Sequence, residues 1–180
     1  MHHEVIISES DRIFLRPLAL ADGKDLFMLN ANPNILQYTG DPPFTNEAAA
    51  VHFIKYYSDY QAYGMGRWVV VNKLSSKFLG WCGLKRHSDG SVDLGFRFFE
   101  NEWNKGYATE ASKLCIAYGF DSLKLTEIIG RAEKENTASI RVLKKLGFTF
   151  ANELPVEGLR SPVTFILTKA NYENQGNHIS

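Results

Sequence analysis

The sequence predicts a mixed α/β fold, in which helices cover both faces of one sheet. Three observations support this prediction: segments typical of strands cluster in the middle of the chain, helical segments interrupt them unevenly, and no repeat, low-complexity tract or linker divides the 180 residues. A chain of this length buries a core without disulfides or metals. We expect a single domain over 1–180, with its core at about 10–170 and a polar tail, 171–180, that frays.

The first half of the chain supplies one strand, two helices and two loops. An apolar strand is expected over 12–16, a weakly helical stretch over 22–30, and Pro-containing loops at 32–34 and 41–43. A helix over 45–63 follows, with Thr45 placed as its N-cap.

The second half alternates strands and helices. A helix at 105–123 begins soon after a strand, and a helix at 136–146 ends at Gly147, a residue suited to close it. The expected strands are, in order, 68–71, 78–84, 92–99, 128–132, 148–153 and 163–168. The strands crowded together in the centre favour a sheet that is mixed rather than all parallel.

The bulk composition excludes several classes of function. Twenty basic and twenty acidic residues cancel, so no overall field draws the chain to nucleic acid or to an anionic membrane. No apolar run is long enough to cross a bilayer, and residues 1–4 lack the order of a secretion signal. Cys82 and Cys115 lack metal-ligand or redox spacing, so we expect no metal, no disulfide and a reducing cytoplasm. The pair His2-His3 is either native or an expression remnant.

The turn that leads from the strand 92–99 into the next helix is suited to bind an anion. A helix start presents unpaired N–H groups and partial positive charge. Gly106 removes the side chain where a phosphate would approach, Ala108 keeps the next turn small, and Lys105 adds a positive charge. Taken alone, the pattern fits a tight helix entry packed with small residues equally well. The glycine spacings of a P-loop and of a dinucleotide fold are both missing.

Three separated segments resemble the GNAT acetyltransferase superfamily. The segment 94–111, with Trp103-Asn104-Lys105-Gly106-Tyr107-Ala108 at its centre, resembles the acetyl-CoA motif Gln/Arg-x-x-Gly-x-Gly/Ala, with Trp103 in the first place. The segment 10–18 resembles the opening strand of the RimJ/RimL-like branch, which acetylates protein N-termini and other amines. The segment 135–148 resembles the second cofactor motif, Asn-x-x-Ser followed by Lys-Leu-Gly-Phe. The matches occur in the family's order and cover roughly residues 10–150.

The resemblance implies a GNAT fold, which is a mostly antiparallel sheet with one splayed parallel pair, here the strands 94–99 and 128–132. The pantetheine arm of acetyl-CoA is expected to enter the gap and to pair with the backbone of Phe96, Arg97 and Phe98, beside a bulge at Gly95. Asn136 is expected to bond to the same arm, although Asn136 or Thr137 also suits a helix N-cap. The expected pyrophosphate ligands are the amides of Asn104, Lys105, Gly106, Tyr107, Ala108 and Thr109.

The resemblance also implies direct transfer of the acetyl group from the thioester to a primary amine. Many relatives protonate the departing thiolate with a tyrosine, but this chain has Leu143 at that position. Ser139 is the alternative donor, unless its hydroxyl is bonded to the helix backbone. Asp93 is the candidate base, acting through water, and an ion pair with Arg97 or Arg131 is its other interpretation. A strand N–H near Phe96 is expected to hold the oxyanion.

The acceptor is expected to be a protein N-terminus or a small-molecule amine. A polyamine or aminoglycoside acetyltransferase of the same fold is one alternative, although the segments 30–44 and 154–162, expected at the mouth of the site, contain only Asp41 and Glu157 as acids. A non-catalytic CoA-binding module is the other, because Leu143 replaces the tyrosine and no base is obvious. Relatives often dimerise, so a homodimer is a further expectation.

Overall fold

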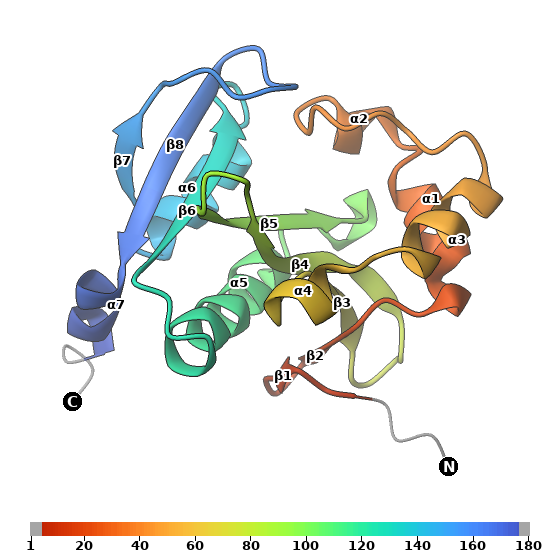
Figure 1. Cartoon of the computed structure of the whole chain (residues 1–180). Helices are drawn as coiled ribbons and strands as arrows, with labels where there is room; N and C mark the ends of the chain where they lie inside the picture. Colours follow the sequence, from red (N-terminus) through yellow and green to blue (C-terminus); the bar gives the residue numbers. More distant parts are fainter. Residues whose placement is uncertain (1–4, 177–180) are drawn as a thin grey trace.

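The structure, a computed structural model, describes residues 5–176, and the pair His2-His3 lies outside them. An eight-stranded sheet with the order β1-β2-β3-β4-β5-β6-β8-β7 forms its centre (Figure 1). The strands are β1 Ser8–Glu9, β2 Ile13–Arg16, β3 Arg67–Asn72, β4 Phe78–Arg86, β5 Val92–Phe98, β6 Glu127–Glu133, β7 Thr149–Asn152 and β8 Pro162–Thr168. The helices are α1 Gly23–Leu29, α2 Pro33–Leu36, α3 Glu47–Lys55, α4 Asp59–Tyr63, α5 Tyr107–Ala117, α6 Thr137–Lys145 and α7 Lys169–Gly176.

The sheet is antiparallel except between β5 and β6, which run parallel. The two parallel strands share a single pair of partner residues, Asp93 and Ile129. By contrast, β4 and β5 pair without interruption from Gly80 opposite Phe98 to Arg86 opposite Val92. The expected mixed sheet with one splayed parallel pair is therefore confirmed.

The two faces of the sheet bury different helices. Residues that are partners across neighbouring strands lie on the same face, and successive residues alternate between faces. On one face, Cys82 and Leu94 pack with Cys115 of α5 and Leu143 of α6, and we call it the α5 face. On the other, Trp81 packs with α1 and α3, and we call it the α1 face. Among residues 5–176, no helix is long and apolar enough to cross a membrane.

The expected helix over 45–63 is two helices, α3 and α4, and its N-cap is Asn46 rather than Thr45. The Asn46 side chain accepts a hydrogen bond from the Ala49 amide at 2.9 Å. The break follows from tertiary hydrogen bonds to β3. The Tyr57 hydroxyl accepts from the Arg67 amide at 2.8 Å, and the Tyr60 hydroxyl donates to the Arg67 carbonyl. These hydrogen bonds to Arg67, the first residue of β3, compete with continuation of the helix.

Three further segments differ from expectation. The expected loop at 32–34 begins the helix α2, because Asn32 caps it by accepting from the Asn34 amide at 2.9 Å. Of the tail 171–180 that was expected to fray, residues 171–176 belong to α7, where Tyr172 stacks on Phe120 with ring centroids 4.9 Å apart. The helix α5 ends at Ala117 and continues as a π-helical turn, Tyr118–Ser122. Gly147 closes α6 with a φ of +87°, as expected.

The packing of α6 against β6 predicts a stability effect at Gly130. A Cβ atom there would lie 2.5 Å from Cδ2 of Leu143, which is buried and cannot swing away. Gly130→Ala is therefore expected to lower the free energy of unfolding by about 1–3 kcal/mol in urea denaturation. Gly176→Ala is the control, because no atom of the described residues lies within 4 Å of its added Cβ. Equal unfolding midpoints for the two variants would contradict this packing.

Candidate active site

A cleft with a volume of about 240 Å³ opens where β5 and β6 separate. Both faces of the sheet line it: Asp93 and Arg97 belong to the α1 face of β5, whereas Leu94 and Phe96 belong to its α5 face. The residues of α6 that complete the lining are Asn136, Ser139 and Leu143. The cleft therefore lies within the gap between the two strands, where residues from both faces of the sheet meet.

Two loops cover the cleft, one after α2 and one between β7 and β8 (Figure 1). They meet backbone to backbone at Gly40 and Gly158, where a Cβ on Gly40 would lie only 2.4 Å from the Gly158 carbonyl oxygen. The second loop is held by the buried carboxylate of Glu133, which accepts hydrogen bonds from the amides of Arg160 at 2.6 Å and Ser161 at 2.9 Å. The contact between Gly40 and Gly158 limits the width of the entrance on the α1 face.

Arg97 fastens the first of these loops. Its side chain is 5% exposed, and it donates to Asn30 and, at 2.8 Å, to Asp41. Burial lowers the pKa of Arg97, and the hydrogen bond and charge of Asp41 oppose that effect. Trp81 lies beneath the guanidinium, and Arg67 lies over the same ring at 4.7 Å. The alternative that Asp93 pairs with Arg97 is therefore wrong. Because the Arg97 side chain is bonded to Asn30 and Asp41, only its backbone remains to bind a cofactor.

Asp93 lies at the point where the sheet opens. Its carboxylate is 3.8 Å from the Arg131 guanidinium, which was one of its two expected partners, and 3.4 Å from Nε2 of His87. Lys85 stands directly opposite Asp93 in the register of β4 and β5. Sequence reasoning did not single out His87. The feature that could have identified His87 is the hairpin between β4 and β5. The His87 amide donates to the Ser91 carbonyl at 2.8 Å, and this closure brings His87 beside Asp93.

The turn before α5 has the backbone conformation of an anion site. Asn104 and Gly106 both have positive φ, +61° and +83°, and Gly106 is the N-cap of α5 without any side-chain cap. The first amides of α5 therefore lack a capping partner among the described residues, and they remain for a ligand. A Cβ on Gly106 would approach no atom closer than Arg12 Nη2 at 3.5 Å, so the approach is open. Lys105, however, pairs with Glu102 at 2.9 Å.

Long-range contacts hold this turn in place. The Arg12 guanidinium donates to the Lys105 carbonyl at 3.2 Å and pairs with Glu110 in the first turn of α5. The Ser10 hydroxyl donates to the same carboxylate at 2.6 Å. At the other end, the Trp103 indole donates to the Phe98 carbonyl at 3.0 Å. The turn is thus fixed both to the loop between β1 and β2 and to the end of β5.

The helix α6 presents two polar side chains to the cleft. Asn136, rather than Thr137, is its N-cap and accepts from the Ser139 amide at 3.2 Å, which leaves its NH₂ group for a ligand. The half-buried Ser139 hydroxyl has no hydrogen bond to any residue in the described range, so the alternative of a bond to the helix backbone is not seen. Leu143 is 2% exposed and packs on Gly130.

Gly95 does not form the expected bulge. The pairing of β4 and β5 continues without a register shift through Gly83 opposite Gly95. The absence of a side chain serves packing instead, because a Cβ on Gly95 would lie 3.3 Å from the ring of Trp81. The nearby register shift lies in the pairing of β3 with β4, between Val70 and Val71.

Comparison with known proteins identifies the family. The model of the acetyltransferase (GNAT) domain matches residues 12–149. The chain belongs to the GNAT family. It is 32% identical over 142 residues to the uncharacterized N-acetyltransferase p20 of Bacillus licheniformis, a match that covers 77% of this chain and 80% of that protein. This GNAT protein is an N-acetyltransferase.

Two further relatives are spermidine acetyltransferases. The spermidine N(1)-acetyltransferase of Escherichia coli (strain K12) is 28% identical over 142 residues, which cover 78% of this chain and 74% of that protein. The crystal structure of spermidine N-acetyltransferase from Vibrio cholerae in complex with CoA and spermine has a TM-score of 0.77 at 20% identity, over 92% of this chain and all of that chain. The second likeness is one of fold.

The residues present suit acetyl-CoA, whose binding the GNAT fold supports. An uncapped helix start accepts a pyrophosphate, and the edge of β5 beyond Asp93 has no partner strand on its β6 side. In the described part of the chain, no three His, Cys, Asp or Glu side chains are grouped to hold a metal ion. Cys82 and Cys115 are buried free thiols with their sulfur atoms 3.4 Å apart.

The contacts of Glu110 predict a pH dependence of stability. Burial raises its pKa, but hydrogen bonds from Ser10 and Arg12 outweigh this and lower the pKa overall. A lowered folded-state pKa stabilises the protein above the ordinary glutamate pKa, and that stabilisation is lost as pH falls through the folded value. Glu110→Gln is expected to cost about 1 kcal/mol at pH 7 in urea unfolding, a deficit that shrinks as the pH falls below the ordinary glutamate pKa.

Glu127 serves as the control for this effect, because it is exposed and has no ion pair with a described residue. Glu127→Gln is expected to leave stability unchanged at both pH values. A deficit of Glu110→Gln that stayed constant from pH 7 to pH 3 would contradict the ionic role of Glu110.

Proposed function

We propose that the protein transfers an acetyl group directly from acetyl-CoA, bound on the α5 face, to a primary amine that enters from the α1 face. The observation that carries this proposal is the cleft where β5 and β6 separate, which residues from both faces of the sheet line. Because reacting groups must meet in one geometry, a passage that opens to both faces lets donor and acceptor approach without displacing one another.

The donor is proposed to lie between α5 and α6. Its pyrophosphate binds the amides from Asn104 through Lys105, Gly106, Tyr107 and Ala108 to Thr109, where the helix dipole favours negative charge. Its pantetheine arm pairs with the free backbone edge of β5, from Phe96 through Arg97 to Phe98, as an added strand would. The Asn136 NH₂ group then donates to the same arm. The open φ > 0 turn and the single β5–β6 residue pair support this placement.

The proton steps are assigned to three side chains. His87 removes a proton from the attacking amine, since an imidazole is the commonest general base, and Asp93 orients it. The Asp93 carboxylate is paired with Arg131 and stands opposite Lys85 in the register of β4 and β5, so it is assigned the orienting role. When the tetrahedral intermediate collapses and the C–S bond breaks, the thiolate takes a proton from Ser139. The proton that His87 took from the amine then passes through water to Ser139, so that both side chains return to their starting state. The N–H near Phe96 stabilises the oxyanion.

The acceptor is proposed to be a small-molecule amine or the flexible N-terminus of a protein. The meeting of Gly40 with Gly158 supports this, because a roofed passage admits a slender group and excludes a folded surface. The segments 10–18 and 135–148 favour the RimJ/RimL-like branch on resemblance. The two free thiols favour a cytoplasmic location.

A polyamine acceptor is the second candidate, because the similar Escherichia coli protein is a spermidine N(1)-acetyltransferase. The charges of the cleft weigh against it. Polycations are bound by carboxylates, but Asp41 and Asp93 are already paired with arginine, and Glu157 lies exposed on the covering loop. The non-catalytic alternative has less support, since the half-buried Ser139 hydroxyl remains available as a proton donor.

Thiol release from acetyl-CoA across a panel of amines tests the function, and Gly106 variants test the donor site. Gly106→Glu places negative charge beside the pyrophosphate, whereas Gly106→Gln adds equal bulk and equal backbone strain. We expect calorimetry to show acetyl-CoA binding at least about tenfold weaker in the Glu variant than in the Gln variant. Equal affinities would overturn the assignment of this turn, and failure of every amine would overturn the transfer reaction.

Removal of the Ser139 hydroxyl tests the proton donor. Ser139→Ala is expected to lower kcat about 10²-fold, in the range of a lost general acid, with little change in acetyl-CoA affinity. Ser139→Thr, which retains a hydroxyl, is expected to recover part of the rate. An unchanged kcat in the Ala variant would remove Ser139 from the mechanism.

A further inference from the structure

The acceptor side of the cleft carries an excess of basic side chains. Strand register places them together on the α1 face, since Lys85 is the partner of Asp93, Arg97 of Trp81, and Arg67 of Gly83. Arg131 follows two residues after Ile129, which pairs with Asp93. The lining of the cleft thus contains four cations, Arg67, Lys85, Arg97 and Arg131, and three carboxylates, Asp41, Asp93 and Glu157.

Two of the three carboxylates are paired with arginine, and the third, Glu157, lies exposed on the covering loop. Asp41 lies 2.8 Å from the Arg97 guanidinium and 3.8 Å from that of Arg67. Asp93 lies 3.8 Å from Arg131. Lys85 is exposed and has no ion pair within 4 Å to any residue between 5 and 176. After these pairings, the ammonium group of Lys85 remains as a positive charge that the protein itself does not neutralise.

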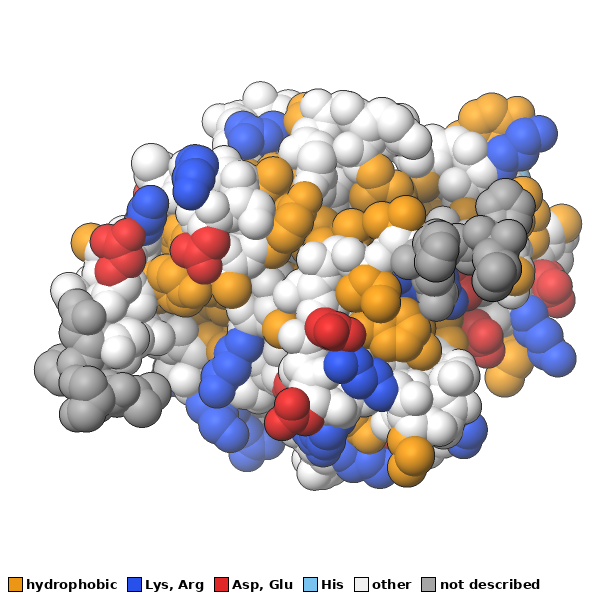
Figure 2. All heavy atoms as spheres, turned by 90° about the horizontal axis from the view of Figure 1, so that it is seen from below, with side chains coloured by type: hydrophobic (Ala, Val, Ile, Leu, Met, Phe, Trp, Pro, Cys, Tyr) orange, Lys and Arg blue, Asp and Glu red, His pale blue; other side chains and the backbone are white. Residues whose placement is uncertain are grey.

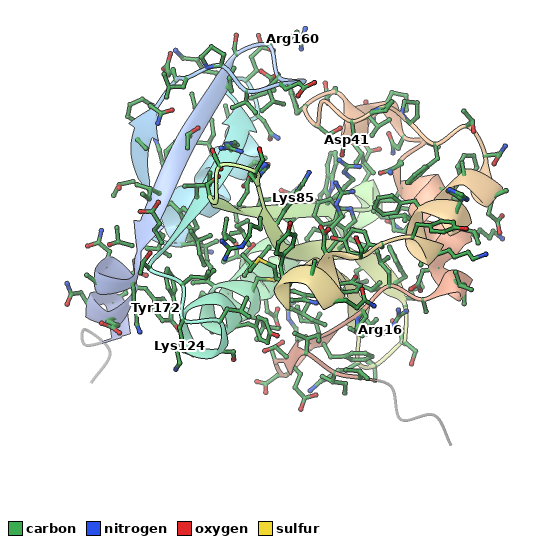
Figure 3. The ribbon with its side chains drawn as sticks, in the orientation of Figure 1. Arg16, Asp41, Lys85, Lys124, Arg160 and Tyr172 are labelled. Atoms are coloured by element: carbon green, nitrogen blue, oxygen red, sulfur yellow. The ribbon has the colours of Figure 1, made fainter. Side chains whose placement is uncertain are left out.

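These basic side chains are not placed to bind the phosphates of acetyl-CoA. The proposed pyrophosphate site is at the start of α5, which packs on the opposite face of the sheet from Lys85. The excess is also local, because the formal net charge of the chain is zero. The face seen in Figure 2 carries basic and acidic side chains interspersed with apolar ones. Figure 3 shows Lys85 between the halves of the molecule that carry Asp41 and Arg160.

We propose that the acceptor is a primary amine that also carries a carboxylate, as an amino acid does, and that Lys85 binds this carboxylate. This inference rests on the proposed function and names its substrate class. Lys85 stands beside Asp93 and His87, where the amine loses its proton, so a carboxylate held by Lys85 lies a few bonds from the reacting nitrogen. Arg67, stacked on Trp81, is the next cation along this face. A polyamine would meet the same cations with like charge.

Matched acceptors that differ only in the carboxylate test the proposal. The pairs are lysine with cadaverine and tyrosine with tyramine, and spermidine is added as the polycation. The full-length protein and acetyl-CoA are used in a thiol-release assay. Because a hydrogen bond to a charged group is involved, we expect kcat/KM to be about tenfold or more higher for the carboxylated member of at least one pair. Spermidine is expected to be a poorer acceptor than that amino acid.

Substitution of Lys85 tests whether this residue binds the carboxylate of the acceptor. Lys85→Gln is expected to lower kcat/KM for the preferred amino acid about tenfold more than for its decarboxylated partner, and Lys85→Glu to lower it further. Lys85 is exposed, so both variants are expected to fold. Lys124→Gln is the matched control, because Lys124 is exposed and lies away from the cleft (Figure 3). Its rates and acceptor preference are expected to equal those of the wild type.

The possible outcomes distinguish a failure of the carboxylate proposal from a failure of the proposed acetyl transfer. If cadaverine, tyramine or spermidine is acetylated as fast as the best amino acid, the transfer reaction stands and the carboxylate proposal fails. If an amino acid is preferred but Lys85→Gln leaves the preference intact, the assignment of Lys85 fails. If no amine releases CoA thiol although acetyl-CoA binds, the proposed function fails together with this inference.

Discussion

The separation of β5 from β6 is the constraint on which the rest of the site depends. Two neighbouring strands that share one pair of partners, Asp93 and Ile129, leave backbone donors and acceptors unpaired along an inner edge. Unpaired backbone groups inside a protein are costly unless a ligand or water satisfies them. The same gap lets side chains from opposite faces, such as Arg97 and Phe96, line one passage. Donor recognition and acceptor access therefore have a common physical origin.

Buried charges then define the shape of the acceptor entrance. The side chain of Arg97 is 5% exposed, and a guanidinium at that depth is tolerated only with hydrogen-bonded partners, which Asn30 and Asp41 provide. Glu133, equally buried, is satisfied by amides of the opposite covering loop. Each charge thus fixes one loop, and the two loops meet at Gly40, where no side chain fits. Changes to these charges would alter the entrance rather than the chemistry.

The donor turn depends on contacts distant in sequence as well as on its own residues. Gly106 and Asn104 supply the left-handed conformations, but Arg12 of the loop before β2 and Trp103 hold the turn against the sheet. A rigidly held set of amides needs no rearrangement when an anion arrives. Charge is divided between the two sides of the sheet: backbone dipoles serve the α5 face, whereas full cations gather on the α1 face. In the proposed function, this division of charge lets the donor and the acceptor be recognised by different groups.

The sequence by itself determined the features that local chemistry encodes. Period and turn residues located every strand from β2 to β8, and the glycine of the donor turn and the Asn136 cap followed from residue types at a helix start. The three motif segments led to the GNAT family for the same reason, since they are short and contiguous. Features that depend on one residue meeting another far along the chain were not predictable in this way.

Only the tertiary structure decided those long-range features. Tyr57 and Tyr60 split one expected helix because they bond to β3, and Tyr172 orders an expected tail by stacking on Phe120. Arg97 and Asp93 lie on the same face of β5, four residues apart, but Arg97 pairs with Asp41 instead. Asp41 comes from a distant loop that only the fold brings beside Arg97. Periodicity encodes the direction of a side chain, whereas its partner depends on which distant segments the sheet brings together.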